Sequence, residues 1–350
     1  MKNQRKRTWT ALLLAVSILF TLPVWVTGSV RAVDLEGPCS LTMVPSDNSA
    51  EETADITENA HVVVDLYRVA NAVEVPGYDT YDYQLIAPFT ELEGDLAQAR
   101  EAEPEEGSVT WEQLAGRAAN IALGENNSGL QKTTANMGEA AELTSGLYLV
   151  VAHSEGMALT DYVKNEENGI VTIAQSPEYE YTFATSLVSL PSTNANLATT
   201  GMNTADGTWA NNVTGTLKFS REQRFGDLTI TKTLDGYSPA HGASFVFQVE
   251  ARGANDEIVY SNVVSMEFTA SGTQSYTLER IPAQSEVTVT EVYSGTAYTP
   301  AAATPPPVVI IAADTVEVAF ENSYTGGGNY SSSTLNHFEY TADGWAWTQQ

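Results

Sequence analysis

Short runs of alternating apolar and polar residues, bounded by Gly, Asn, Asp and Pro, are the dominant pattern of this sequence. Such runs are typical of β-strands that bury one face. The pattern predicts strands that include His61 to Val69, Gly146 to Ala152, Glu178 to Leu190, Asp227 to Leu234, Ser244 to Ala251, Ser285 to Val292 and Thr315 to Tyr324.

One segment has helical periodicity instead. Its apolar residues recur at steps of three and four, which places them on one face of a helix; they are Trp111, Leu114, Ala115, Ala118, Ile121 and Ala122. We predict a helix that Trp111 anchors in the core. The expected fold class is all-β: two tandem Ig-like β-sandwich domains, the first with a helical insertion, which suits the length of the chain.

Residues 1–32 have the composition of a signal peptide. A basic stretch at residues 2–7 precedes an apolar run at residues 11–26, and small residues follow at a cleavage position. A retained membrane anchor is less favoured because Pro23 interrupts the run and no stop-transfer flank follows. We therefore expect a protein that is secreted or held at the cell surface, with no membrane insertion after cleavage.

The chain after this segment is strongly acidic. Five of the 16 basic residues and none of the 44 acidic residues lie in residues 1–32, so the remainder carries 11 basic and 44 acidic side chains. This charge repels nucleic acid and anionic lipid, and we expect neither as a partner. Solubility outside the cell is the simplest explanation, with cation binding or adhesion as alternatives.

Disulfide and catalytic signatures are sparse. The single cysteine, Cys39, excludes an intramolecular disulfide and is expected to be a partly buried free thiol. The four histidines lack metal-ligand spacing, and no phosphate-binding loop or Gly-x-Ser-x-Gly motif is present. We expect no cofactor, no metal and a non-enzymatic protein. A secreted hydrolase such as a glycosidase, with two carboxylates among the 44, is the alternative.

Strand parity places polar side chains inside the second predicted domain. Residues of one parity share one face of a strand. Each of three strands carries one polar residue on its apolar face: Lys232 in 228–234, Glu291 in 287–291, and Asn322 in 316–324, where Tyr324 shares the inward face.

These three side chains are expected to meet, because burying any of them alone costs several kcal/mol. Burial disfavours charge, which leaves a neutral amine beside a protonated acid. The amine can attack the asparagine carbonyl while the acid polarises it and shuttles protons, and ammonia leaves. We predict an amide crosslink between Lys232 and Asn322 with Glu291 as its catalyst. A hydrogen-bonded cluster without a crosslink is the alternative, and Asn336 is a second candidate partner if the last strand is misassigned.

The same part of the chain resembles the Cna B-type module of Gram-positive pilins and adhesins. The resemblance covers about residues 225–325 and lies in the order and spacing of Phe225 to Thr233, Ser244 to Phe247, Val287 to Glu291 and Val318 to Asn322. It implies a spontaneous isopeptide bond between Lys232 and Asn322, catalysed by Glu291.

Residues 33–220 resemble the N-terminal domain of Spa-type backbone pilins through Val64 to Ala70 and Gly146 to Val150. Trp209, Val213 and Lys218 keep the pilin spacing W-x3-V-x4-K, which implies that Lys218 accepts an acyl group from a sortase and links subunits. Departures from the family pattern stand at Gly215, Thr216, Leu217 and Phe219. An ordinary exposed lysine at a strand end is the alternative, and no crosslink is expected in this domain.

The predicted order is thus a signal peptide (1–32), a pilin-like sandwich (33–220), a Cna B-type sandwich (225–325), and a Gly/Ser linker with a terminal hairpin (326–350) around an Asp-Gly turn. No LPxTG-like sorting signal occurs before residue 350, so a released, non-polymerising adhesin is an alternative to a pilin subunit. Expected partners are other pilin subunits or an extracellular-matrix ligand, together with a sortase if Lys218 is used.

Overall fold

The computed structural model describes residues 33–46, 50–101, 108–124, 129–166, 169–193, 209–326, 336–341 and 344–349. The predicted signal peptide lies outside these residues, as does most of the polar loop at residues 192–207. The chain divides into two compact units, one made of Met1–Ala174 with Thr182–Ser220 and the other of Gln175–Tyr181 with Arg221–Gln350.

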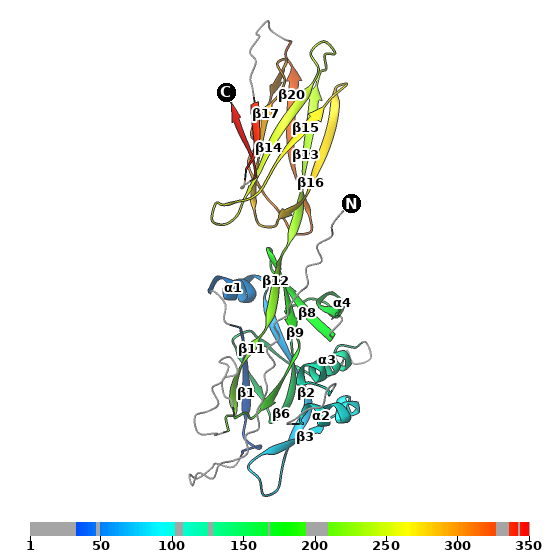
Figure 1. Ribbon diagram of the computed structural model, residues 1–350, viewed down its shortest axis with the longest axis vertical. Helices are drawn as coiled ribbons and strands as arrows, with labels where there is room; N and C mark the ends of the chain where they lie inside the picture. Colours follow the sequence, from blue (N-terminus) through cyan, green and yellow to red (C-terminus); the bar gives the residue numbers. More distant parts are fainter. Residues whose placement is uncertain are drawn as a thin grey trace. The chain divides into compact units, whose positions relative to one another are not determined.

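The second unit is a β-sandwich, and its two layers are visible in Figure 1. One four-stranded sheet has the order β16-β13-β20-β18, and the other has the order β15-β14-β17-β19. The strands are β13 (Phe225–Asp235), β14 (Ser244–Arg252), β15 (Ile258–Glu267), β16 (Gly272–Pro282), β17 (Glu286–Tyr293), β18 (Tyr298–Pro300), β19 (Val308–Val309) and β20 (Thr315–Tyr324).

Alternation of residue type creates the core between these sheets. Along β13, every second residue from Gly226 to Leu234 is buried, whereas Thr229, Thr231 and Thr233 are partly exposed. The inward residues of both sheets form one apolar cluster, in which the rings of Phe247 and Phe320 lie 4.8 Å apart. The first and last long strands of this sandwich, β13 and β20, are parallel neighbours.

The first unit contains a five-stranded sheet in which the path β10-β6-β2-β3 carries β4 as an additional partner of β2. Its other strands belong to a sheet of order β11-β1-β5 and, in part, to a sheet of order β12-β9-β8-β7. Their bounds are β1 (Cys39–Pro45), β2 (Val62–Glu74), β3 (Tyr81–Leu85), β4 (Thr133–Asn136), β5 (Ala140–Leu143), β6 (Gly146–Ser154), β7 (Val163–Glu166), β8 (Gly169–Gln175), β9 (Tyr179–Ala184), β10 (Ser186–Leu190), β11 (Asn212–Leu217) and β12 (Phe219–Gln223).

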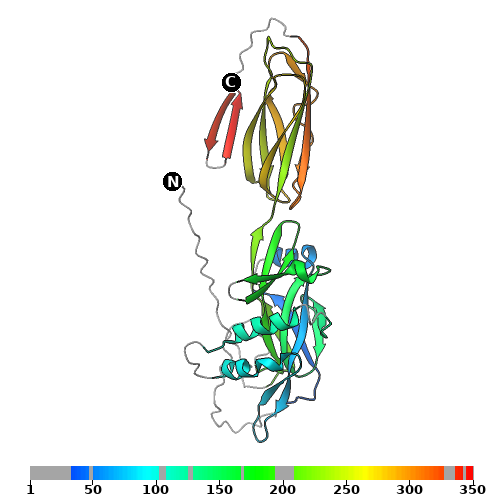
Figure 2. The same ribbon diagram turned by 90° about the vertical axis from the view of Figure 1, so that its right-hand side faces the viewer.

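The predicted helix is α3 (Trp111–Ala122), which begins with a capping box between Thr110 and Gln113. Leu114 and Ala118 are fully buried, but Trp111 is only partly buried at the edge of the core and is not its anchor. An ion pair between Arg117 and Asp95 joins α3 to α2 (Glu93–Ala99), and Figure 2 shows the two helices together on one side of the first unit.

The structure also contains helical segments that the sequence analysis did not predict. Further short helical segments are α1 (Ala50–Ala54), η1 (Asp55–Asn59), η2 (Phe89–Leu92), α2 and α4 (Leu159–Tyr162). None of these reaches two full turns, so their apolar residues cannot establish a helical period in the sequence. None of the described helices is long and apolar enough to cross a membrane.

Two predicted boundaries also differ from the observed ones. The predicted strand from 178 to 190 is interrupted at Thr185 and forms β9 and β10, which belong to different sheets. The strand predicted to start at Asp227 begins two residues earlier, because β13 starts at Phe225 and directly follows β12 (Phe219–Gln223).

Near the C-terminus, β21 (Asn336–Thr341) and β22 (Gly344–Gln349) pair as an antiparallel hairpin, with Tyr340 opposite Trp345. Asp343 of the predicted turn lies outside the described residues.

Candidate functional site

The lysine that strand parity places in the core of the second unit is fully buried. Lys232 has 0% of its surface exposed and lies on β13 between Ile230 and Leu234. Its Nζ atom is 4.5 Å from the ring centroid of Phe245 and 5.7 Å from those of Phe247 and Phe320. An amine in this apolar surrounding needs hydrogen-bond partners within the protein.

Two polar side chains supply these partners. Lys232 Nζ donates to Glu291 Oε2 at 2.8 Å and to Asn322 Oδ1 at 2.5 Å. Asn322 Nδ2 donates to Glu291 Oε1 at 2.5 Å. The carboxylate thus bridges the amine and the amide, and the three groups form a closed ring of hydrogen bonds. We call Lys232, Glu291 and Asn322 the core triad.

Both sheets of the sandwich contribute to the core triad. Lys232 and Asn322 come from the parallel neighbours β13 and β20, where Lys232 is paired with Phe320 and Asn322 with Leu234. Glu291 comes from β17 in the opposite sheet, and its backbone N–H donates to Ala303 O at 2.7 Å. The strand alternation therefore aims all three side chains at the same point between the sheets.

Burial also changes the protonation of the amine. Removal from water lowers the pKa of Lys232 below its ordinary value, although the hydrogen bond and charge of Glu291 act in the opposite direction. A lowered pKa increases the fraction of neutral amine, which is the nucleophilic form. The arrangement places this amine against an amide carbonyl, with a carboxyl group that contacts both.

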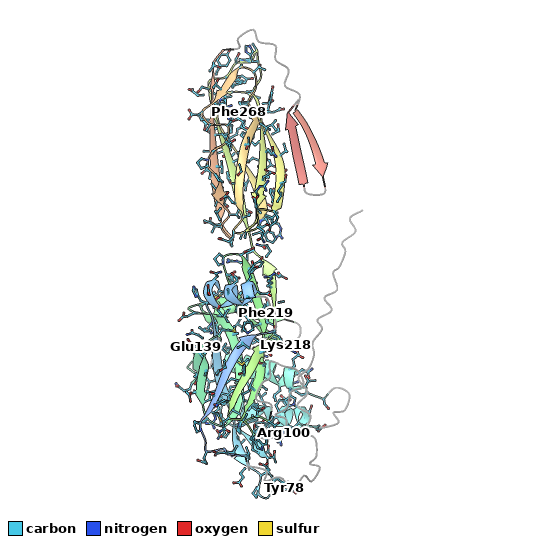
Figure 3. The ribbon with its side chains drawn as sticks, turned by 90° about the vertical axis from the view of Figure 1, so that its left-hand side faces the viewer. Tyr78, Arg100, Glu139, Lys218, Phe219 and Phe268 are labelled. Atoms are coloured by element: carbon cyan, nitrogen blue, oxygen red, sulfur yellow. The ribbon has the colours of Figure 1, made fainter. Side chains whose placement is uncertain are left out.

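The other predicted site residues do not join the core triad. Lys218, labelled in Figure 3, is exposed between β11 and β12 in the first unit. Val213 of the same motif is buried in β11, and Trp209 is partly buried with its ring 5.2 Å from that of Tyr81. Asn336 starts β21 opposite Gln349, whereas the asparagine that accepts from Lys232 is Asn322.

Two smaller expectations need correction. Tyr324 is 38% exposed because the inward alternation of β20 fades at the last residue of the strand. Cys39 is more deeply buried than expected, with 1% exposure in β1. Its burial, and to a smaller extent the charge of Asp34, raises the pKa of the thiol, which disfavours the reactive thiolate.

The sequence analysis missed a polar cluster in the first unit. Its centre is Asp65 on β2, which is fully buried. Thr134 Oγ1 donates to Asp65 Oδ1 at 2.6 Å, Lys132 forms an ion pair with Oδ2, and His153 Nε2 lies 2.9 Å from the same oxygen. We call Asp65, Lys132, Thr134 and His153 the aspartate cluster. The available signal was an acidic residue within the mostly apolar run Val62 to Val69, which also contains Arg68.

The contacts of Asp65 determine its charge. Burial alone would raise the pKa of this carboxyl group, but the hydrogen bonds from His153, Lys132 and Thr134 outweigh burial and lower the pKa below its ordinary value. The carboxyl group is therefore held as an anion, with a donor on each side of it.

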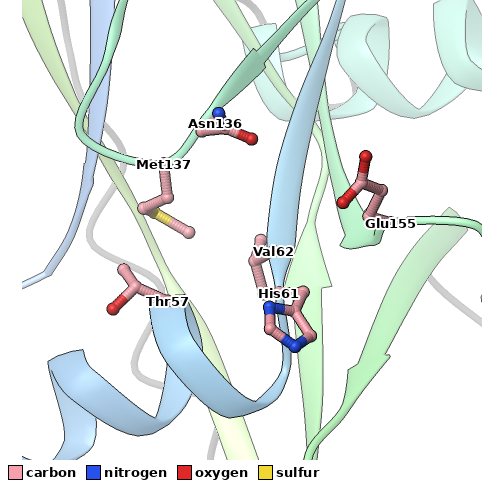
Figure 4. Close-up of a pocket in the computed structure, with 6 residues that line it drawn as sticks. All are labelled: Thr57, His61, Val62, Asn136, Met137 and Glu155. Atoms are coloured by element: carbon pink, nitrogen blue, oxygen red, sulfur yellow. The ribbon is translucent and has the colours of Figure 1, made fainter.

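A small pocket of about 90 Å³ lies near the start of β2, and Figure 4 shows the residues around it. His61 and Glu155 are its two titratable residues, and Glu155 N donates to His61 O at 2.9 Å. Across the described parts of the chain, no three His, Cys, Asp or Glu residues are grouped so that they could hold a metal ion.

Comparisons with known proteins reveal a family match and several similar structures. The model of a domain of unknown function, DUF5979, matches residues 228–325. No curated protein matches the sequence.

The similar solved structures are pilins and adhesins. The pilus-presented adhesin Spy0125 (Cpa) is 17% identical, with 42% of this chain and 37% of the adhesin covered and a TM-score of 0.25. The minor pilin GBS52 of Streptococcus agalactiae is 14% identical, with 84% and 100% covered and a TM-score of 0.21. An adhesin of Mobiluncus mulieris that contains disulfide, isopeptide and ester cross-links is 14% identical, with 75% and 84% covered and a TM-score of 0.23. This chain thus spans just over a third of the length of the Spy0125 adhesin.

We predict that Asp65→Asn destabilises the first unit in a pH-dependent way. At pH 7 the variant should lose about 2 to 3 kcal/mol of unfolding free energy, because an anion with three donors is replaced by a neutral amide. The folded-state pKa of Asp65 is lowered, so its stabilisation is complete above an unfolded-state pKa of about 3.9 and declines as the pH falls through the folded value. Denaturant titrations at pH 7 and below pH 4 should show the difference from wild type shrinking.

Asp82→Asn is the matched control. Asp82 pairs with Arg100, and both side chains are at least 40% exposed, so its loss should change stability little at either pH. A deficit of Asp65→Asn that stays constant down to pH 2 would contradict the assignment of a charged Asp65.

Proposed function

We propose that this chain is a structural protein of the bacterial cell surface, of the pilin or adhesin type, whose second unit is closed by an isopeptide bond between Lys232 and Asn322. The observation that carries the proposal is the core triad, in which a buried amine, a carboxyl group and an amide are mutually hydrogen-bonded.

The reaction is a transfer of the asparagine acyl group from ammonia to lysine. The neutral Nζ of Lys232 attacks the side-chain carbonyl carbon of Asn322, and a C–N bond forms. Glu291, whose two oxygens contact Nζ and the amide nitrogen, takes a proton from Nζ and delivers a proton to the departing amide nitrogen. Ammonia leaves, a secondary amide remains, and Glu291 returns to its starting state. No oxidant, metal or cofactor is required.

A permanently unreacted cluster is the competing explanation. It would keep three polar groups in an apolar core where hydrophobic residues of similar volume are often as stable or more so. The reaction explains why polar residues occupy these core positions, because it converts an ionisable amine and a primary amide into one neutral linkage. The short contacts on both sides of Glu291 suit the proton transfers that the reaction needs.

The remaining features favour a structural role at the cell surface. The chain has an N-terminal segment of signal-peptide composition and a strongly acidic remainder with one cysteine. A protein exported without disulfides gains rigidity if another covalent bond closes its sandwich. Exposed Lys218 is the proposed acceptor if the protein is also joined to other subunits.

We predict that the full chain from residue 33 has an intact mass lower than its sequence mass by one ammonia molecule. Glu291→Gln should restore the full mass, because glutamine cannot exchange protons, and Asn322→Ala should show no ammonia loss. Mass spectrometry of the intact protein, followed by peptide mapping for a branched Lys232–Asn322 peptide, makes the measurement.

Glu317→Gln is the matched control, since Glu317 lies on β20 near Asn322 in the chain but is exposed. It should retain the ammonia deficit. A wild-type protein whose intact mass equals its sequence mass would contradict the proposed crosslink.

We also predict a large difference in stability between crosslinked and uncrosslinked protein. Lys232 and Asn322 are 90 residues apart in the sequence. A crosslink that closes a loop of this length lowers the entropy of the unfolded chain and so raises its free energy by about 4 to 5 kcal/mol. Glu291→Gln should therefore lower the unfolding free energy of the second unit by about this amount, whereas Glu317→Gln should not. Denaturant titration makes the test, and equal midpoints for wild type and Glu291→Gln would speak against a covalent link.

Subunit linkage through Lys218 has a separate test. In cell-wall extracts of the source organism, peptide sequencing by mass spectrometry should find Lys218 joined through its side chain to the C-terminus of another polypeptide. Lys164, which is also exposed, should not be joined in this way. Unmodified Lys218 in that material would remove polymerisation from the proposal and leave the core triad unaffected.

A further inference from the structure

A short connecting segment joins the two sheets of the second unit next to the core triad. It runs from Pro300 to Thr304, between β18 and β19, and we call it the strap. Pro300 is paired with Asn322 of the core triad, and Ala301 N donates to Glu321 O at 2.9 Å. The strap therefore begins on β20, the strand that carries the asparagine.

The other end of the strap is held by the strand that carries Glu291. Glu291 N donates to Ala303 O at 2.7 Å, and Thr304 Oγ1 donates to Thr290 Oγ1 at 3.3 Å. The chain thus passes directly from β20 in one sheet to β17 in the other. It links the two backbones whose side chains meet in the hydrogen bond between Asn322 Nδ2 and Glu291 Oε1.

The sequence of this segment restricts its conformation. Pro300 opens the strap and Pro305 to Pro307 follow it, and each proline fixes its own φ. Beyond these prolines, β19 returns to pair with β17. Ala301 to Ala303 are exposed, and the contacts that anchor them use backbone groups. The strap therefore acts on its neighbours through its backbone and its length.

A β-bulge next to Glu291 gives the strap more influence over this residue. In the pairing of β14 with β17, Val246 is paired with Tyr293 and Phe247 with Glu291, which leaves Val292 opposite no residue of β14. Bulges bend a strand and change the direction of the side chains beside them. Regular pairing with β14 is thus interrupted directly after Glu291, and the strap supports the other edge of β17 at this residue.

The three members of the core triad are not fixed to one another equally. Lys232 and Asn322 lie on neighbouring strands, so the continuous pairing from Asp227 to Asp235 sets their separation. Glu291 belongs to the other sheet, and the strap is a direct backbone link from its strand to that of Asn322. A misplacement of about 1 Å can slow a reaction about a hundredfold. The distance that most needs control is therefore the one that the strap spans.

We propose that the strap positions Glu291 against Lys232 and Asn322 and so determines how fast the isopeptide bond forms. This role rests on the proposed crosslink and adds to it a positioning element outside the core triad. The strap acts on the reacting groups through the backbones of β17 and β20. A longer or looser strap should therefore slow the loss of ammonia without unfolding the sandwich.

The first test lengthens the strap. A Gly-Gly pair is inserted between Ala302 and Ala303 in the full chain from residue 33. The protein is made by cell-free synthesis, translation is stopped, and samples quenched at intervals are analysed for intact mass. We expect the variant to lose ammonia more slowly than the wild type by about tenfold or more, because the added residues uncouple β17 from β20 at Glu291.

The matched control carries the same Gly-Gly insertion after Ala254, in the exposed turn between β14 and β15. It should lose ammonia at the wild-type rate. Both insertions are also made in the Glu291→Gln protein, where no bond forms, to separate positioning from stability. There the two insertions should give the same denaturant midpoint, since a small increase in loop length costs little free energy.

A second variant loosens the strap without lengthening it. Ala302→Gly combined with Ala303→Gly removes only methyl groups of exposed residues and gives the backbone more conformational freedom. It should slow the loss of ammonia by about twofold to fivefold. This variant keeps the test decisive even if the insertion prevents folding.

Three results would overturn the proposal. Equal rates for the strap insertion and the control insertion, with ammonia lost from both, would remove the role of the strap and leave the crosslink in place. A strap insertion that lowers the midpoint of the Glu291→Gln protein well below that of the control insertion would show a structural role instead. A wild-type protein that loses no ammonia would contradict the crosslink itself, and this is seen before any strap variant is made.

Discussion

An amine surrounded by three phenylalanine rings has to find its hydrogen-bond acceptors within the core, and the second unit is organised around that requirement. Parallel pairing of β13 and β20 brings the amide of Asn322 to Lys232 within one sheet, and β17 supplies Glu291 from the other. A change in the register of any of these strands by one residue would turn its polar side chain to solvent and leave the other two unsatisfied. The core triad therefore specifies the pairing of the sandwich as well as its chemistry.

The two buried clusters use similar residues with different results. In the core triad the ammonium is fully buried, and the loss of water favours the neutral amine. In the aspartate cluster the side chain of Lys132 is 38% exposed, and three donors hold Asp65 as an anion. A carboxylate anion is a poor acceptor of a nucleophile, and a solvated ammonium is a poor nucleophile. The second arrangement is thus suited to a lasting ion pair.

The part of the site that could be predicted is the part on strands with one buried face. Along β13, β17 and β20 burial alternates, so the inward positions of Lys232, Glu291 and Asn322 could be read from parity. Most of β2 and all of β6 are buried on both faces, so parity says nothing about Asp65 or His153. Their cluster also depends on Lys132, 67 residues from Asp65, and on contacts that only the folded sheet creates. The short helices could not be predicted from the sequence either, because a helix of four to seven residues has too few positions to show a hydrophobic period.

The positions of Lys232 and Asn322 near the C-terminal ends of two parallel strands also determine how this unit would carry mechanical load. With an amide between them, tension entering at Phe225 would run along β13, cross to β20 at the bond and leave after Tyr324. The intervening 90-residue separation corresponds to about 300 Å of extended chain that could not be pulled out. Under a force that unravels an ordinary sandwich, this unit would lengthen only by its short flanking segments and would transmit the load as a nearly inextensible link.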